Sequence, residues 1–291
     1  MNFDLMEKEI RENNINVIRW VMYENGEITE RELVKSYPCS NCYSISKAFT
    51  ATAIGLLYDM GKITPDDYIA DILKDELPEK YDDNLKKVKI RHLLTHTTGF
   101  TEGCLFEGDR YSHNTDDFLD FTLTSSIAHE PGTVFVYSNA STYILSCAVE
   151  KISGMRMDFF LRKHLFSKIG ITQYAWECCQ MGHTMGATGL YLPTRDLLRF
   201  GILFLNNGVW ENERVISEKW VEMATNVQSA QDNSGFGFWV DEKNKFYSAM
   251  GAFSQTLCII PEKNIVFAEH AFESEKGDEL GKINNKYLGI L

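Results

Sequence analysis

The chain has 291 residues, 44% of them hydrophobic, and a formal net charge of −12. A chain of this length and composition buries a full core without disulfide support, and it does not belong to the disordered, collagenous or fibrous classes. Because the acidic balance repels phosphate groups and anionic lipids, we expect neither nucleic acid nor a membrane as a partner.

The first residues of the chain carry charges throughout and lack the apolar core and the small-residue cleavage site of a signal peptide. The sequence also has no run of about 18 apolar residues that could form a transmembrane helix. Its seven cysteines are an odd number in a chain that does not need them, which favours reduced thiols over a disulfide framework. Together these features predict a cytoplasmic protein.

Two strands are predicted near the amino terminus, in residues 15–23 and 28–33, joined by Asn25-Gly26. Asn-Gly supplies the positive φ angles of a primed hairpin turn, and we expect the first strand to lie at a sheet edge. From Ser44 the apolar spacing becomes helical and stays so until Gly61.

The middle of the chain is predicted to be mainly helical and the last third mainly strand. Residues 64–130 hold helical stretches broken by prolines and a glycine. Further helices are predicted over 141–152, 157–169 and 194–205, and strands over 235–240, 246–250, 256–260 and 265–270. Terminal strands that share one antiparallel sheet, with helices beside it, give an α+β fold. We therefore expect an α/β domain from residues 1–60 and 185–291, and a mainly helical region over 61–184.

Some motifs have spacings that exclude the chemistry they suggest. His92 and His96 stand at i and i+4, but Leu93 replaces the Glu that a zinc protease uses as its base. The segment from Gly277 through Gly281 to Lys282 is one residue too short for a P-loop and lacks the following Ser or Thr. No Gly-x-Ser-x-Gly occurs in the sequence, so the nucleophile elbow of the α/β-hydrolases is absent.

The cysteines offer one more candidate for a metal or redox site. Cys39 and Cys42 form a C-x-x-C, and Cys178 and Cys179 are adjacent, so four sulfurs could in principle bind zinc. Adjacent cysteines rarely ligate one ion together, and the βαβ context of a redox C-x-x-C is missing. We expect incidental or buried thiols, with no metal and no cofactor.

Ser44 and Lys47 form a Ser-x-x-Lys at the start of the first long helix. A serine needs a base within hydrogen-bond reach to act as a nucleophile, and a lysine one helical turn away lies on the same face. The free N–H groups of a helix amino terminus also favour a developing oxyanion. The alternative is an N-capping serine followed by a surface lysine.

Two further segments stand downstream, RHLLTHTTGF at 91–100 and PGTVFVYSN at 131–139. With them and the Ser-x-x-Lys motif, the sequence resembles the serine β-lactamase-like hydrolases, which include class C β-lactamases, D-alanyl-D-alanine peptidases and related esterases and amidases. The resemblance continues through GLYLPTRDLLRFG at 189–201 and the strand pair that ends at Pro261. It implies a β-lactamase/transpeptidase-like fold with the active site between the helical region and the sheet domain.

The resemblance also implies roles for individual residues. Ser44 matches the acylated nucleophile, and Lys47 matches the lysine that shares its proton. Tyr137 matches the general base that later protonates the leaving group, and the cation of Lys47 favours its deprotonated form. Asn139 matches the asparagine that contacts this lysine and the acyl-side amide of the substrate. The alternative for Tyr137 and Asn139 is a turn with a capping residue before a helix.

The third element of the family departs from its usual pattern here. It is normally Lys or His, a small residue and Gly on an edge strand, and the best match is Ala249-Met250-Gly251. Gly251 lets a substrate lie close to the strand, and the N–H of Ala252 pairs with that of Ser44 as the oxyanion hole. Ala249 cannot offer a cation to the carboxylate that β-lactams and D-Ala-terminated peptides carry.

The leading hypothesis is a serine hydrolase that forms an acyl-enzyme on Ser44 and hydrolyses small esters or amides, so that the expected partner is a small molecule. One alternative is a weak β-lactamase or D-aminopeptidase that uses another cation, such as Arg110 or Lys245, for the carboxylate. The other is a binding protein that kept the fold and lost turnover. No oligomeric state is predicted.

Other residues in these motif segments have structural interpretations. His92 and His96 are expected to be hydrogen-bonded core histidines, and Asp196 with Arg199 a helix-start salt bridge. Several side chains of the last third are candidates for lining the cleft, and none of them is singled out: Tyr191, Trp239, Tyr247, Phe253 and Gln255.

Overall fold

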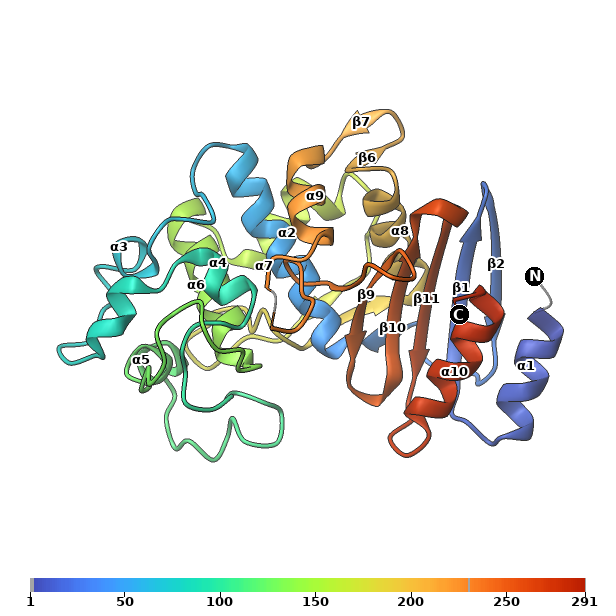
Figure 1. Ribbon diagram of the computed structural model, residues 1–291, viewed down its shortest axis with the longest axis horizontal. Coiled ribbons are helices and arrows are strands. Elements are labelled where there is room, and N and C mark those ends of the chain that lie inside the picture. Colours follow the sequence, from blue (N-terminus) through green and yellow to red (C-terminus); the bar gives the residue numbers. More distant parts are fainter. Residues whose placement is uncertain (1–2, 230, 291) are drawn as a thin grey trace.

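The computed structural model describes residues 3–229 and 231–290. Its main element is a six-stranded antiparallel sheet in the order β2-β1-β11-β10-β9-β8 (Figure 1). Both ends of the chain contribute to this sheet, and β1 pairs directly with β11. The strands are β1 (Val17–Glu24), β2 (Glu27–Glu32), β8 (Trp239–Asp241), β9 (Phe246–Gly251), β10 (Gln255–Ile260) and β11 (Ile265–Ala271).

The predicted hairpin at the amino terminus is present. Asn25 and Gly26 have φ angles of 51° and 97°, as a primed turn requires. The expectation that the first strand lies at the edge is wrong, because β2 occupies that place. The physical reason is burial: Trp20 and Val21 of β1 are fully buried on opposite faces, whereas no residue of β2 is buried.

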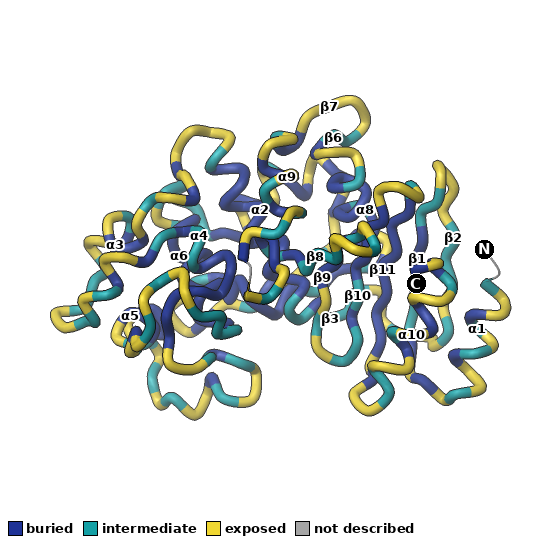
Figure 2. The backbone as a smooth tube through the Cα atoms, viewed as in Figure 1, coloured by how far each residue is buried: buried dark blue, intermediate teal, exposed yellow. Residues whose placement is uncertain are grey.

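Helices cover both faces of the sheet. On one face α1 (Phe3–Glu12) and α10 (Gly277–Leu288) enclose a core around Trp20 and Phe267. On the other face α8 (Thr194–Leu205) packs against β10, β11 and β1. Gly201 permits this close approach, since a Cβ there would lie 2.5 Å from the side chain of Val266. Figure 2 shows the buried strands between these layers.

The helix α2 (Ser46–Asp59) joins the sheet to the helical part of the molecule (Figure 1). Every residue from Ser46 to Leu57 is buried, as expected for a helix with apolar or small residues on all sides. It packs against α6 (Asn139–Ser153), α7 (Met157–Leu161) and α9 (Glu218–Thr225).

The remaining elements are short. The helices are α3 (Ile69–Ile72), α4 (Ile90–Leu94) and α5 (Phe118–Leu123), with the turns η1 (Tyr43–Ile45), η2 (Asp83–Lys87), η3 (Arg162–Phe166), η4 (Ala252–Ser254) and η5 (Pro261–Lys263). The strands are β3 (Cys39–Asn41), β4 (Ala175–Trp176), β5 (Leu190–Pro193), β6 (Val209–Trp210) and β7 (Glu213–Arg214). Within the described ranges, no helix is long and apolar enough to cross a bilayer.

The α+β prediction with terminal strands in one antiparallel sheet is confirmed. Helices α1 and α10, which complete the layer on one face, were absent from the sequence interpretation. The boundaries expected at residues 60 and 185 remain a prediction.

Candidate active site

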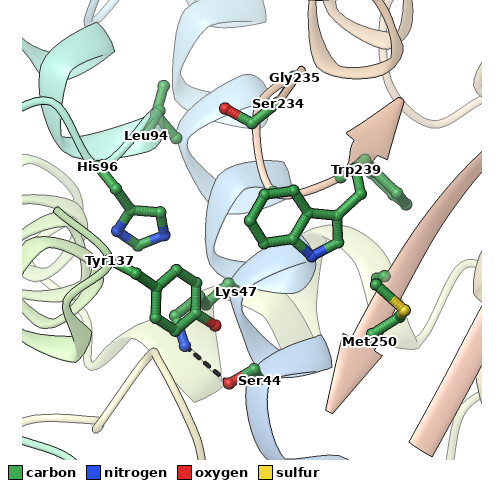
Figure 3. A pocket seen from close by; sticks show the side chains of 12 residues that line it. Ser44, Lys47, Leu94, His96, Tyr137, Ser234, Gly235, Trp239 and Met250 are labelled. Atoms are coloured by element: carbon green, nitrogen blue, oxygen red, sulfur yellow. Dashed lines mark hydrogen bonds between the residues drawn. The ribbon is translucent and has the colours of Figure 1, made fainter. Parts of the chain in front are cut away.

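Ser44 lies in the turn η1 and Lys47 in the first turn of α2, so one helical turn separates them. The Lys47 Nζ donates a hydrogen bond to Ser44 Oγ at 3.0 Å (Figure 3). Asn41 stabilises the turn from the strand side, because its Oδ1 accepts a hydrogen bond from the Tyr43 N–H at 2.8 Å. Tyr43 itself has a φ of 47°, a conformation that non-glycine residues adopt rarely.

Lys47 is almost completely enclosed, with 6% of its surface exposed. Its Nζ donates to three acceptors: Ser44 Oγ, Asn139 Oδ1 at 2.7 Å and the Ala187 carbonyl oxygen at 3.1 Å. These are all the donors an ammonium has. Burial lowers the pKa of Lys47, and the neighbouring Tyr137 opposes this shift. The environment thus brings the neutral amine, which can accept a proton from Ser44, closer in energy to the hydrogen-bonded ammonium.

Tyr137 stands immediately before α6 and faces Lys47. The Lys47 Nζ lies 4.8 Å from the centroid of the Tyr137 ring. In Figure 3 the Tyr137 hydroxyl and the Lys47 Nζ both point toward Ser44. The Tyr137 ring stacks on Trp239 and on Phe106, with centroid distances of 6.2 and 6.3 Å. These ring contacts restrict the tyrosine and aim its hydroxyl at the serine.

The start of α6 separates the roles of two neighbouring residues. Ser138 caps the helix, because its Oγ accepts a hydrogen bond from the Ala140 N–H at 3.2 Å. Asn139 is therefore the first helical residue, and its side chain is free to reach Lys47. The Asn139 Nδ2 donates to the Leu105 carbonyl oxygen at 3.1 Å, which orients the amide oxygen toward the ammonium. The capping alternative thus applies to Ser138 and not to Asn139.

The segment that matches the third family element borders the same site. Ala249 and Met250 line the pocket that contains Ser44. Gly251 lies so close to the turn of the nucleophile that a Cβ on it would be 2.4 Å from the Cys42 carbonyl oxygen. Only glycine permits this approach, which brings the end of β9 beside η1. Ala252 follows as the first residue of η4 and is exposed.

Among the residues that the structure describes, the pocket offers no second lysine or arginine to a substrate. It encloses about 350 Å³, and among the described residues that line it Lys47 is the only lysine or arginine. Arg110 instead forms an ion pair with Glu177 at 2.9 Å. Lys245 pairs with Glu262 at 2.6 Å on the open surface. Neither of the two cations considered for a carboxylate therefore lies in the pocket wall.

Comparisons with known proteins identify the family of this chain. The sequence model of the Beta-lactamase family matches residues 39–271. The chain belongs to the Beta-lactamase family. It is 25% identical over 206 residues to the 6-aminohexanoate-dimer hydrolase of Paenarthrobacter ureafaciens, covering 66% of this chain and 53% of that protein. It is 30% identical over 155 residues to penicillin-binding protein 4* of Bacillus subtilis (strain 168), covering 51% of this chain and 33% of that protein.

The chain thus spans about half or less of the length of these two relatives. The structure of a class C beta-lactamase superposes with a TM-score of 0.76 at 17% identity, covering 99% of this chain and 94% of that one. This likeness confirms the β-lactamase/transpeptidase-like fold. The named relatives include hydrolases, so the resemblance inferred from the sequence and the general class of activity are both supported.

His96 has a larger place in this Beta-lactamase-family site than the sequence indicated. It is buried, and its Nδ1 accepts a hydrogen bond from the Ser138 N–H at 3.4 Å, as expected for a core histidine. It also lines the pocket, with its ring centroid 4.5 Å from that of Tyr137. Burial, with a smaller contribution from Lys47, lowers the pKa of His96 to about 3. It is therefore a neutral support for Tyr137 at physiological pH.

The other cleft candidates separate into two groups. Trp239 lines the pocket. Tyr247 is buried against Phe238, and Gln255 is buried with its amide bonded to the Ala271 carbonyl oxygen. Tyr191 donates to Glu177, and Phe253 packs on Tyr43 with a centroid distance of 5.1 Å. Sequence periodicity could not distinguish the candidate that lines the pocket from those that are buried elsewhere, because an aromatic residue in a strand is compatible with either position.

The predicted salt bridge between Asp196 and Arg199 is present, with a distance of 2.9 Å between Asp196 Oδ1 and an Arg199 guanidinium nitrogen.

The cysteines of the described ranges are all free. Cys42 is buried, and its Sγ lies 3.7 Å from His270 Nε2. Burial raises the pKa of the Cys42 thiol, so it is not a thiolate nucleophile. Cys179 contacts the Tyr143 hydroxyl at 3.3 Å. No group of three potential metal ligands occurs among the residues that the structure describes.

Proposed function

We propose that this chain is a serine hydrolase that forms an acyl-enzyme on Ser44 and hydrolyses esters or amides with an uncharged acyl group. The observation that carries the proposal is the Lys47 Nζ, which hydrogen-bonds at once to Ser44 Oγ and to Asn139 Oδ1. Lysine is almost never fully buried without a partner or a function. A surface lysine after a capping serine would be exposed to solvent.

Acylation begins with the proton of Ser44. It passes to the Lys47–Tyr137 pair as the Ser44 Oγ forms a bond to the carbonyl carbon of the substrate. The two groups can share this proton, because the Lys47 Nζ lies 4.8 Å from the centroid of the Tyr137 ring and both side chains face Ser44. The oxyanion accepts hydrogen bonds from the N–H groups of Ser44 and Ala252. The bond to the leaving group then breaks, and Tyr137 donates a proton to it.

Deacylation repeats these steps with water. Tyr137 accepts a proton from the water as its oxygen attacks the acyl carbon. The bond to Ser44 Oγ then breaks, and the serine regains its proton from the same pair. The acid leaves the pocket, and the starting protonation state is restored.

The charge of the pocket selects the substrate. A carboxylate beside Ala249 would lose water without gaining an ion pair, which is unfavourable in an enclosed site. An uncharged ester or amide has no such penalty. The relative named 6-aminohexanoate-dimer hydrolase supports the view that members of this family hydrolyse small molecules.

The test is labelling with a fluorophosphonate probe, followed by intact-mass spectrometry, with p-nitrophenyl butyrate hydrolysis measured in parallel. We expect one adduct and ester turnover in the wild type, and neither in Ser44→Ala. Ser167→Ala is the matched control, because Ser167 is exposed and its Oγ bonds only to the Lys163 carbonyl oxygen.

Two results would overturn this proposal. Wild-type turnover by a well-folded Ser44→Ala protein would move the nucleophile elsewhere. A folded wild type that neither reacts nor turns over would favour the binding-protein alternative. A third experiment, incubation of the wild type with a penicillin, decides the remaining alternative. A Ser44 adduct that forms and turns over steadily would favour a weak β-lactamase.

A further inference from the structure

A second hollow adjoins the Ser44 pocket on the side of the sheet that α10 covers. It lies between β8, β9, β10 and α10, and it encloses about 750 Å³. We propose that this hollow, the α10 groove, binds an aliphatic arm of the substrate that extends from the carbonyl group at Ser44. This inference rests on the proposed function and adds a substrate class to it: esters or amides with a medium-length alkyl chain.

The groove and the pocket of the nucleophile share two lining residues. Trp239 and Met250 line both of them. Met250 is 50% exposed, which is unusual for a large apolar side chain beside a catalytic pocket. An alkyl chain that leaves Ser44 and passes over Met250 would thus reach the groove along the two apolar side chains that both hollows share. Figure 3 labels Trp239 and Met250 among the side chains that line the Ser44 pocket.

The lining of the groove fits an uncharged alkyl chain. Phe246, Cys258 and Leu288 supply apolar surface, and no lysine or arginine contributes among the described residues. The one carboxylate, Asp241, already accepts hydrogen bonds from the Asn244 N–H and side-chain amide at 2.8 and 3.0 Å. The uncharged polar side chains in the lining are Ser248, Thr256, Asn284 and Asn285, so a charged arm would find no ion-pair partner among the described residues and would be disfavoured.

A glycine in α10 keeps the groove open. Gly281 lines it from the middle of the helix, where glycine is among the poorest residues for helix stability. No atom lies within 4 Å of the position that a Cβ would take, and its φ is not in the left-handed region. A side chain at Gly281 is thus compatible with the backbone and would project into open space.

This open position allows the groove to be filled without disturbing the core. The experiment compares the wild type, Gly281→Phe and Gly281→Ala on two ester series. p-Nitrophenyl acetate, butyrate and octanoate vary the acyl arm, and methyl, butyl and octyl butyrate vary the alcohol arm. Whichever series shows a rise of kcat/KM with chain length identifies the arm that occupies the groove.

In that series, each buried methylene is expected to raise kcat/KM by up to about fourfold. Gly281→Phe should lower kcat/KM for the longest ester by at least about tenfold while the shortest stays within about twofold of the wild type. Gly281→Ala adds only a methyl group and should keep the wild-type profile. Equal thermal stability of the three proteins excludes misfolding, and Gly281→Leu replaces Gly281→Phe if the larger side chain unfolds the protein.

A chain-length profile that is flat in both series, or unchanged in Gly281→Phe, would overturn the inference. Failure of the proposed function would look different, because the wild type would then hydrolyse no ester of any length. In that case the groove is tested with the Ser44→Ala protein, and ligand-observed NMR measures whether it binds N-octylacetamide. Binding that is lost on adding Gly281→Phe would support the groove, and binding that is absent or unaffected would overturn it.

Discussion

Burial gives Lys47 two properties that the proposed chemistry uses together. Removal from water lowers its pKa, so that it can accept a proton. The Asn139 and Ala187 oxygens meanwhile hold its Nζ in hydrogen-bond reach of Ser44. An exposed lysine would have neither property, since it would stay charged and mobile. The fixed position of the Lys47 Nζ beside Ser44, more than the presence of a lysine, distinguishes this site from a chance Ser-x-x-Lys motif.

Tyr137→Phe tests whether the phenol is the general base. The Tyr137 ring contacts to Trp239 and His96 do not involve its hydroxyl, so the variant should fold with nearly unchanged stability. Loss of the proton acceptor should lower kcat for p-nitrophenyl butyrate by about 100-fold or more. Steady-state kinetics with thermal unfolding of both proteins measures the two effects. An unchanged kcat would assign proton transfer to Lys47 alone.

The sequence predicted the part of the site that is local in the chain. Ser44 and Lys47 are one turn apart, and Tyr137 and Asn139 share one short segment, so motif spacing indicated each pair. The contact between the pairs was implied only by the family resemblance. The positions of Met250 and His96 in the pocket wall were not predicted, because they depend on how β9 packs beside η1 and α4 against α6 and not on any local pattern.

At the level of elements, one buried carboxylate joins α10 to the sheet. Glu269 of β11 is completely buried, and its Oε1 accepts a hydrogen bond from Asn284 Nδ2 at 2.9 Å. Glu269 Oε2 and Asn284 Oδ1 have no partner among the described residues. Protonation of Glu269 supplies the donor that these two oxygens lack. Burial accordingly raises the pKa of Glu269 to about 8, against an ordinary value of 4.5.

This carboxylate should make the stability of the protein depend on pH. A group whose pKa is raised by folding contributes its full stability below the unfolded pKa and loses it as pH rises through the folded pKa. The wild type should therefore lose stability relative to Glu269→Gln between about pH 4.5 and 8, by about 1.4 kcal/mol per pH unit within this window. Urea unfolding of both proteins across this range measures the difference. Parallel stability curves would show that Glu269 is already ionised in the folded state.

The helices differ in how well periodicity predicted them. Helices 46–59, 139–153 and 194–205 were predicted to within a few residues, because each has a long apolar stripe and a clear end signal. Helices α1 and α10 were missed. Each buries only a few residues, such as Met6 and Ile10 of α1, and each is stabilised mainly by the sheet and by the other helix. Such a helix is determined by the tertiary structure more than by its own sequence.

For the whole molecule, the order of the predicted elements indicated the class of fold and a sheet shared by both ends of the chain, but not which strands are neighbours in it. The pairing of β1 with β11 joins residues such as Trp20 and Glu269, which are far apart in the sequence. No periodicity within either strand specifies this partner. The shared sheet was predicted from the presence of strands at both ends of the chain, and the observed pairing of β1 with β11 confirms it.

The net charge of −12 acts on substrates before they reach the pocket. At low ionic strength, this charge should repel an anionic ester and attract a cationic one, because the Debye length is about 30 Å at 0.01 M salt. At about 0.15 M it falls to about 8 Å, and only nearby charges are felt. The lack of a second cation in the pocket is such a local effect, and salt should not remove it.

We therefore expect two components in the discrimination against anionic substrates. Raising the salt concentration should increase kcat/KM for mono-p-nitrophenyl succinate several-fold, decrease it for butyrylcholine and leave p-nitrophenyl butyrate unchanged. A deficit of the succinate ester that persists at high salt measures the missing cation beside Ala249, and the part that salt removes measures the field of the whole molecule. A succinate rate that is independent of salt would show that the net charge plays no part in substrate choice, and that the pocket alone selects uncharged acyl groups.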